Sequence, residues 1–208
     1  MMSAAPPSHQ ELPPGTLRRA IVLRWREFLL RRSYKSRLVC KGGITRICIE
    51  GSPRSANSYA VRVFRSANQV PIAHHTHSTE NIVLVLGYGV PVLALIRDPL
   101  DAITFSSLYR KLSLDEEFAR WIDFYTYIES MLDDTVVADS REVVQDYSSV
   151  IGVLNARYGT EFSDIGGIAA QRRLCSETSM TSANCAARGW IRYRYRRQSA
   201  TEQQRSAG

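Results

Sequence analysis

Apolar and polar positions alternate along this chain in a way that predicts strands and helices in turn. Residues 44–50 (ITRICIE) are rich in β-branched residues, and residues 70–73 form a second short apolar segment. Residues 91–96 (PVLALI) are a continuous apolar run, which is typical of a strand buried on both faces of a parallel sheet. A fourth short strand is predicted at residues 135–138.

Helical spacing appears between and after these segments, and another helix is predicted to begin near Leu100. Apolar residues that recur every three or four positions predict a helix with one buried face. Strand and helix therefore alternate, which predicts an α/β domain with a parallel sheet flanked by helices. The remaining helical stretches are Ala60, Val63, Phe64 and Ala67; residues 80–87; Phe118, Trp121, Ile122, Tyr125, Ile128 and Leu132; and Val143, Tyr147, Val150, Ile151, Leu154 and Tyr158, closed by Gly159.

The two ends of the chain differ from this middle. The start is polar and rich in proline, and beyond about residue 170 apolar residues no longer recur at regular spacing. We therefore expect a disordered leader over residues 1–16, a domain over residues 17–170 and a basic, disordered tail over residues 171–208.

A basic N-terminal helix is predicted at the start of the domain. Its apolar side is expected to pack on the domain, with a helix that lies on a membrane surface as the alternative. The apolar residues at helical spacing, set among arginines, are Leu17, Ile21, Trp25 and Phe28.

Composition narrows the class of protein. The net charge is +7, but the arginines gather near both ends, so this charge says little about the middle of the chain. No apolar run approaches the roughly 20 residues that span a bilayer, and the start lacks the apolar stretch of a secretory signal. We expect a cytoplasmic protein with reduced thiols and no transmembrane segment. The four cysteines contain no C-x-x-C pair, which disfavours a zinc cluster or redox motif: Cys40, Cys48, Cys175 and Cys185.

The first candidate site is the junction at residues 50–58 (EGSPRSANS), between a strand and a helix. Small residues there let a phosphate approach the N–H groups at the start of the helix. In the pattern G-x-x-x-x-G-K-[ST], Gly51 fits the first position, Asn57 replaces the lysine, and Arg54 is the nearest cation. The alternative is an ordinary turn with a helix cap at Ser55 or Asn57.

A second candidate junction covers residues 96–106 (IRDPLDAITFS). Arg97 follows a buried strand, at the edge where α/β sheets bind ligands, and an arginine with a serine hydroxyl binds phosphate well. The alternative is that Arg97 and Asp98 pair locally and cap the next helix.

Together the two junctions resemble those of a known family. G-S-P-R-S, followed by one small and two polar residues, resembles the 5′-phosphosulfate loop of sulfotransferases, and R-D-P-L-D with a serine soon after resembles their 3′-phosphate-binding segment. The resemblance covers roughly residues 44–162. It implies a P-loop-type parallel sheet and transfer of a sulfuryl group from 3′-phosphoadenosine 5′-phosphosulfate (PAPS) to a hydroxyl or amine, leaving adenosine 3′,5′-bisphosphate.

The resemblance also implies which residues hold PAPS. Arg97 and Ser106 would hold the 3′-phosphate. The family's serine usually lies eight residues after the arginine, where this chain has Phe105. The family's basic, glycine-containing loop has only the weak counterpart Arg188-Gly189-Trp190 in the tail. The residues implied for the 5′-phosphosulfate are Ser52, Pro53, Arg54, Ser55, Ala56, Asn57 and Ser58.

Three histidines, at positions 74, 75 and 77, follow the second strand and are expected at the same edge of the sheet. Sulfuryl transfer to an alcohol needs a general base, and cations around the sulfate. His75-Thr76-His77 resembles the K-T-H segment that carries the base in many cytosolic sulfotransferases, which implies His77 as the base and His75 as the second candidate. Arg54 is the candidate catalytic cation. The alternatives are packing histidines or a zinc site; no further ligand is evident, so we expect no metal.

Two other functions stay open. A P-loop kinase or nucleotide hydrolase would need a lysine at the position of Asn57 and a carboxylate for magnesium, for which Asp98 is the candidate. A catalytically inactive, sulfotransferase-like binding protein would keep the fold alone. We expect a small-molecule or carbohydrate acceptor and no specific nucleic-acid partner; the acceptor's identity and the oligomeric state are left open by the sequence.

Overall fold

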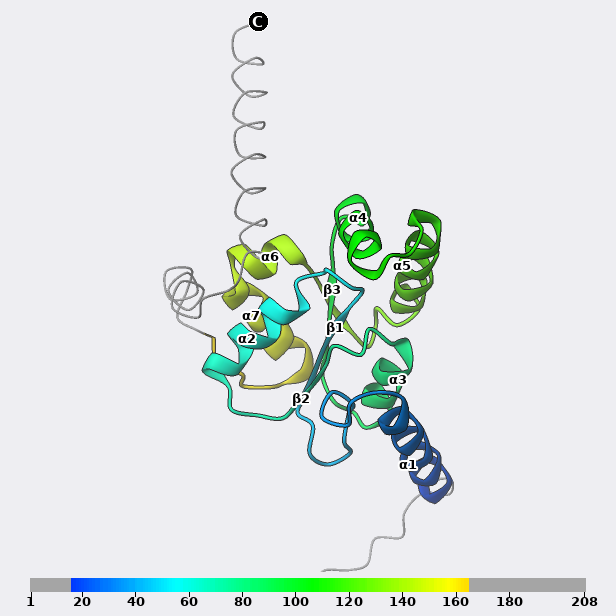
Figure 1. The fold of residues 1–208 in the computed structure, drawn as a ribbon. Coiled ribbons are helices and arrows are strands. Elements are labelled where there is room, and N and C mark those ends of the chain that lie inside the picture. Colours follow the sequence, from blue (N-terminus) through cyan, green and yellow to red (C-terminus); the bar gives the residue numbers. More distant parts are fainter. Residues whose placement is uncertain (1–15, 165–208) are drawn as a thin grey trace, which may run out of the picture. The chain divides into compact units, whose positions relative to one another are not determined.

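A computed structural model describes residues 16–164, and within them it shows a four-stranded parallel sheet with helices on both faces (Figure 1). The strand order is β2-β1-β3-β4. The predicted fold class is confirmed, because each predicted strand is present within a few residues of its expected place. The strands are β1 (Ile47–Gly51), β2 (Ile72–His74), β3 (Val92–Ile96) and β4 (Val136–Asp139).

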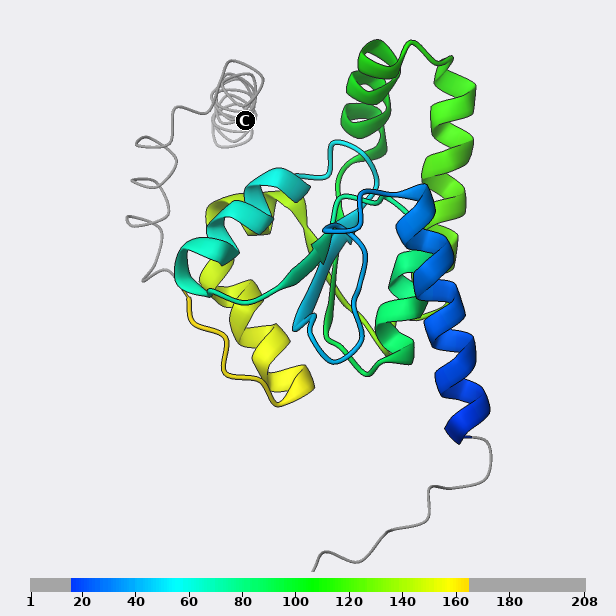
Figure 2. The same cartoon turned by 60° about the horizontal axis from the view of Figure 1, so that its bottom comes forward.

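The helices divide between the two faces of the sheet. The buried residues of α2, α6 and α7 pack on one face, and those of α3 and α5 pack on the other, with α1 outside α3 (Figure 2). The helices within residues 16–164 are α1 (Thr16–Ser33), α2 (Asn57–Ala67), α3 (Thr79–Gly87), α4 (Pro99–Arg110), α5 (Leu114–Glu129), α6 (Ser140–Gln145) and α7 (Tyr147–Tyr158).

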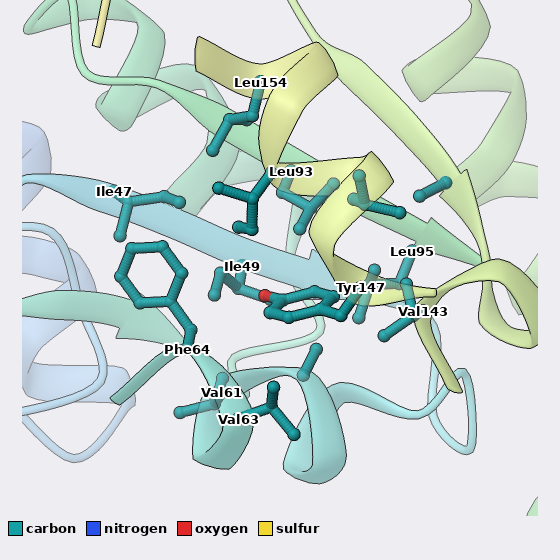
Figure 3. Packing of buried hydrophobic residues seen from close by; sticks show 14 of the residues in the cluster. Ile47, Ile49, Val61, Val63, Phe64, Leu93, Leu95, Val143, Tyr147 and Leu154 are labelled. Atoms are coloured by element: carbon teal, nitrogen blue, oxygen red, sulfur yellow. The ribbon is translucent and has the colours of Figure 1, made fainter. Parts of the chain in front are cut away.

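The central strand β1 contributes side chains to both halves of the core. Ile47 and Ile49 face the first half, where Phe64 of α2 and Tyr147 of α7 surround them (Figure 3). Cys48, between them, faces the second half and is fully buried, as the apolar run around it predicts. Both faces of the strand are covered, which explains why its sequence is nearly continuous in apolar residues.

The last predicted helix is two helices. The apolar period from Val143 to Tyr158 is interrupted at Asp146, whose backbone leaves the helical region (φ −148°, ψ 76°). The Asp146 side chain accepts a hydrogen bond of 3.2 Å from Ser149 N and so caps α7. Gly159 ends α7 in the left-handed conformation, as predicted.

The N-terminal helix is confirmed, but the predicted packing of its apolar stripe is wrong. Ile21, Trp25 and Phe28 are 60%, 61% and 49% exposed. The side that packs on the domain carries Leu23 and buried Glu27, because Glu27 accepts hydrogen bonds from the hydroxyl of Tyr88 and the backbone of Gly42 and so binds α1 to the domain.

Several sequence predictions fall outside this part of the chain. The leader, apart from Thr16, and the tail over residues 171–208 with Arg188-Gly189-Trp190 lie outside the described residues. Within residues 16–164, none of the helices has the length and apolarity needed to cross a bilayer.

Candidate functional site

The first predicted junction runs from the end of β1 to the start of α2. Gly51 lies close against β3, because a Cβ at this position would overlap the carbonyl oxygen of Leu95. Two loop residues, Arg54 (φ 70°) and Ala56 (φ 64°), adopt left-handed backbone conformations that are costly for residues other than glycine. Such a loop needs strong support from its surroundings.

A buried tyrosine on α5 supplies that support. The hydroxyl of Tyr125 donates a 2.7 Å hydrogen bond to the carbonyl oxygen of Leu95 and accepts one of 3.3 Å from Ser52 N. Because its proton is used in this way, we assign the 3.0 Å contact with Ser55 as a bond donated by Ser55 Oγ. Burial raises the pKa of Tyr125, although its hydrogen bonds with Ser52 and Ser55 lower it, so the phenol stays protonated. The hydroxyls of Ser52 and Ser55 are buried and engaged inside the loop.

The start of α2 has no side-chain cap within the described part of the chain. Ala56 is the N-cap residue and has no side-chain hydrogen-bonding group, so the alternative of a cap at Ser55 or Asn57 is wrong. The Asn57 amide turns back instead and donates to the carbonyl oxygens of Gly51 (3.3 Å) and Ser52 (3.1 Å). The first N–H groups of a helix lack partners within the helix, so the N–H groups of Asn57 and Ser58 at the start of α2 are suited to an anion beside the loop.

A buried carboxylate positions the histidine segment. Glu50, at the end of β1, is fully buried and accepts hydrogen bonds from Thr76 N (2.7 Å), Thr76 Oγ1 (2.6 Å) and His77 N (3.2 Å). These bonds hold His75 (φ 58°) and His77 (φ 51°) in left-handed backbone conformations. The pKa of Glu50 is raised, because the effect of burial outweighs that of the hydrogen bonds from Thr76 and His77.

His77 contacts the loop itself. Its Nδ1 lies 2.7 Å from the carbonyl oxygen of Gly51, which can only accept a hydrogen bond. In the neutral tautomer Nδ1 therefore carries the proton, and Nε2 keeps its lone pair. An imidazole oriented through Nδ1, with Nε2 able to accept a proton, has the arrangement of a general base.

The other two histidines form a hydrogen-bonded chain to Ser58. Arg65 Nη2 lies 2.8 Å from His74 Nε2 and can only donate, so His74 carries its proton on Nδ1. His74 then donates to His75 Nδ1 at 2.6 Å, and His75 donates from Nε2 to Ser58 Oγ at 2.8 Å. Burial, with smaller contributions from neighbouring positive charges, lowers the pKa of His74 and of His75 to about 4, so both are neutral near pH 7. In this arrangement the Ser58 hydroxyl accepts a hydrogen bond from His75 and can donate its own proton to a ligand. Both ring nitrogens of His75 are engaged, so His75 cannot act as the general base.

The structure brings the two predicted junctions together. Arg97, at the end of β3, donates from Nη1 to the carbonyl oxygen of Arg54 at 3.2 Å and lies 3.8 Å from the carboxylate of Asp101. Asp98 caps α4 by accepting from Leu100 N at 3.0 Å, and it pairs with Arg141 at 3.8 Å. The alternative of a local cap therefore holds for Asp98, but the pairing it assumed does not, because Arg97 pairs with Asp101 and Asp98 with Arg141. Arg97 also connects the two junctions.

The resemblance places Ser106 and Arg97 at one phosphate, and the structure shows no hydrogen bond between them. Ser106 is buried on α4, and its hydroxyl has no hydrogen-bond partner within residues 16–164. The guanidinium of Arg97 lies over the ring of Phe105 instead, 5.8 Å from its centroid. Arg54 lies over Tyr109 at 4.5 Å. Sequence reasoning missed these two aromatic contacts, because they depend on how α4 is placed beside the loop.

Metal ligands do not gather in the described part of the chain: residues 16–164 contain no group of three or more His, Cys, Asp or Glu side chains that could hold an ion. Comparison with known family models, with curated proteins and with solved structures finds no match to this chain. A functional proposal must therefore rest on the geometry of the two junctions and the histidines.

Proposed function

We propose that this protein is a sulfotransferase that moves a sulfuryl group from PAPS to a hydroxyl or amine of a small-molecule or carbohydrate acceptor. The observation that carries the proposal is the hydrogen bond from Arg97 to the carbonyl oxygen of Arg54. It joins two arginine-bearing strand–helix junctions on the adjacent strands β1 and β3. A ligand with an anionic group at each of two ends suits such a pair of junctions.

The residues at the first junction fit a phosphosulfate group. The N–H groups of Asn57 and Ser58, the guanidinium of exposed Arg54 and the hydroxyl of Ser58 are all donors, and all lie beside one loop. Arg97 would hold the 3′-phosphate at the second junction. PAPS, when bound, supplies a sulfuryl group that is already activated by its bond to a phosphate.

The chain's own residues account for the proton and the charge. In the proposed reaction His77 Nε2 takes the proton of the acceptor hydroxyl as the acceptor oxygen bonds to sulfur and the bond from sulfur to the bridging phosphate oxygen breaks. Arg54 and the α2 N–H groups offset the negative charge that develops on that oxygen. Adenosine 3′,5′-bisphosphate leaves, and the proton remains on His77 until solvent removes it.

The kinase alternative has less support. The Asn57 amide, at the position of the P-loop lysine, is used inside the loop, and the Asp98 carboxylate is used in capping α4 and pairing with Arg141. The inactive alternative differs from the main proposal only in turnover, so a binding experiment and an activity assay separate the three functions.

Calorimetry with adenosine 3′,5′-bisphosphate tests the proposal. The protein should bind this ligand without metal and more tightly than magnesium–ATP. Arg97→Ala should weaken it by about 10- to 100-fold more than it weakens adenosine 5′-monophosphate, since only the bisphosphate carries a 3′-phosphate. Arg97 also donates to the Arg54 carbonyl oxygen, so its loss disturbs the first junction for both ligands. The measure is therefore the ratio of the two losses in affinity.

Arg141→Ala is the matched control, because Arg141 pairs with Asp98 across the start of α4. This variant should leave the ratio of the two affinities unchanged. Tighter binding of magnesium–ATP, or an equal loss of both adenosine ligands in Arg97→Ala, would refute the sulfotransferase proposal.

A further inference from the structure

Helix α1 is apolar on two opposite sides. Leu23 and Leu30 face the domain and pack against its second core cluster. At about 100° per residue, a second apolar group lies on the far side of the helix and faces away from the domain. We call this group the outer apolar patch; it comprises Ile21 (60% exposed), Val22 (45%), Trp25 (61%), Phe28 (49%) and Leu29 (47%).

Three residues of the outer apolar patch, Ile21, Trp25 and Phe28, form a contiguous apolar surface. The rings of Trp25 and Phe28 stack with centroids 5.7 Å apart, and together with Ile21 they line a shallow hollow. Single exposed hydrophobic residues are normal on a protein surface, whereas a contiguous group marks a contact with something else. Figures 1 and 2 show α1 at the edge of the domain, outside α3.

Arginines surround this patch. Arg18 precedes it and Arg32 follows it along the helix, and the Arg32 guanidinium lies over the ring of Phe28 at 5.6 Å. Arg24 and Arg26 lie on its two flanks by helical position. The helix has one acidic residue, Glu27, and that side chain is buried on the opposite side, where it pairs with arginines. Arginines therefore stand around the patch, although Arg24 on one flank is also paired with Glu27 at 3.6 Å, so the charge of the rim is strongest at Arg18, Arg26 and Arg32.

We propose that α1 lies on the surface of a membrane containing anionic phospholipids, with the outer apolar patch in the acyl region and the surrounding arginines at the lipid phosphates. Arginine suits this position, because its long apolar stem follows the patch while its guanidinium reaches the headgroups. A flat anionic surface meets every side of the rim at once. A second copy of the chain would bring two arginine rims face to face, and this repulsion disfavours self-association through the patch.

Vesicle co-sedimentation of the full chain tests the proposal. The protein should bind vesicles of phosphatidylcholine with about one third phosphatidylserine, bind pure phosphatidylcholine weakly, and lose its binding as salt rises. Ile21→Asp and Trp25→Asp should each weaken binding to the anionic vesicles by about ten-fold or more, since a charge replaces an inserted apolar group. The control Val153→Asp, which alters a comparably exposed valine on α7 (55%), should bind like the unaltered protein.

A fluorescence measurement keeps the test independent of folding. Trp25 emission, obtained as the difference between the protein and its Trp25→Phe variant, should be quenched by brominated acyl chains in the same anionic vesicles. Full vesicle binding by Ile21→Asp and Trp25→Asp would overturn the proposal, as would unquenched Trp25 emission or no binding by the unaltered chain. A dimer in sedimentation velocity that Trp25→Asp abolishes would overturn it too, by showing that the patch joins two copies.

Discussion

The substitution Tyr125→Phe removes one hydroxyl and keeps the ring that packs beneath the first loop. It deprives the carbonyl oxygen of Leu95 of a donor and Ser52 N–H of an acceptor. The hydroxyls of Ser52 and Ser55 lie 3.3 Å apart and can pair with each other instead, so two groups lose a partner. A buried polar group without its partner costs about 1–3 kcal/mol, which gives about 2–6 kcal/mol for two. We expect a destabilisation in the lower half of this range, about 2–4 kcal/mol, because a carbonyl oxygen tolerates the loss of a hydrogen bond better than an N–H group does.

Urea unfolding followed by circular dichroism measures this difference in the free energy of unfolding. The matched control is Tyr127→Phe, which removes the hydroxyl of a tyrosine that is 40% exposed on the same helix, and it should change the free energy by less than about 0.5 kcal/mol. If Tyr125→Phe is as stable as the control, the Tyr125 hydroxyl does not support the loop and our account of the loop fails. A double variant with Ser55→Ala should lose less stability than the sum of the single changes, since the two side chains share one hydrogen bond.

Three further changes test the site. His77→Ala should abolish sulfuryl transfer while the affinity for adenosine 3′,5′-bisphosphate stays within about two-fold, and full turnover in this variant would rule out His77 as the base. Burial lowers the pKa of His74 and His75 from 6.5 to about 4, so between these pH values the unfolded chain binds more protons than the folded one. The free energy of unfolding in urea titrations should therefore fall as the pH drops from about 6.5 towards 4. A His74→Gln variant that shows the same fall would contradict this. Gly51→Ala should destabilise the fold by about 1–3 kcal/mol through overlap with the neighbouring strand, whereas Gly152→Ala, in open space on α7, should stabilise it by up to about 1 kcal/mol in the same assay.

The strands could be predicted well because each has a simple physical cause in the sequence. β3 is covered on both faces, so all five of its residues had to be apolar, and the predicted range 91–96 differs from Val92–Ile96 by one residue. The break between α6 and α7 had no such signal. Val143 and Tyr147 both face the core, so the apolar period continues across it, and only the capping by Asp146 reveals it.

Apolar periodicity also predicts a buried face without showing how much of it reaches the core. In α5 the stripe runs through Phe118 and Ile122, which are 48% and 41% exposed, whereas Phe124 and Ile128 are buried. Glu50 did give a signal, because a carboxylate at the end of an apolar strand must find donors if it is buried. Which donors it finds, Thr76 and His77, depends on the neighbouring strand β2, and no local pattern shows that.

The amino-acid types in the first loop do not show which residues support the loop and which face a ligand. Ser52 and Ser55 are serines like Ser58, yet their hydroxyls turn inward, because Ser55 Oγ bonds to the hydroxyl of Tyr125, 70 residues later, and pairs with Ser52 Oγ. Ser58 is the second residue of α2, and because His75 donates to its hydroxyl, that hydroxyl keeps its own proton to donate outward. The seven loop residues implied by the resemblance therefore divide by physical role. Changes at Ser52 and Ser55 should act first on the stability of the loop, and changes at Arg54 and Ser58 first on the anion it binds.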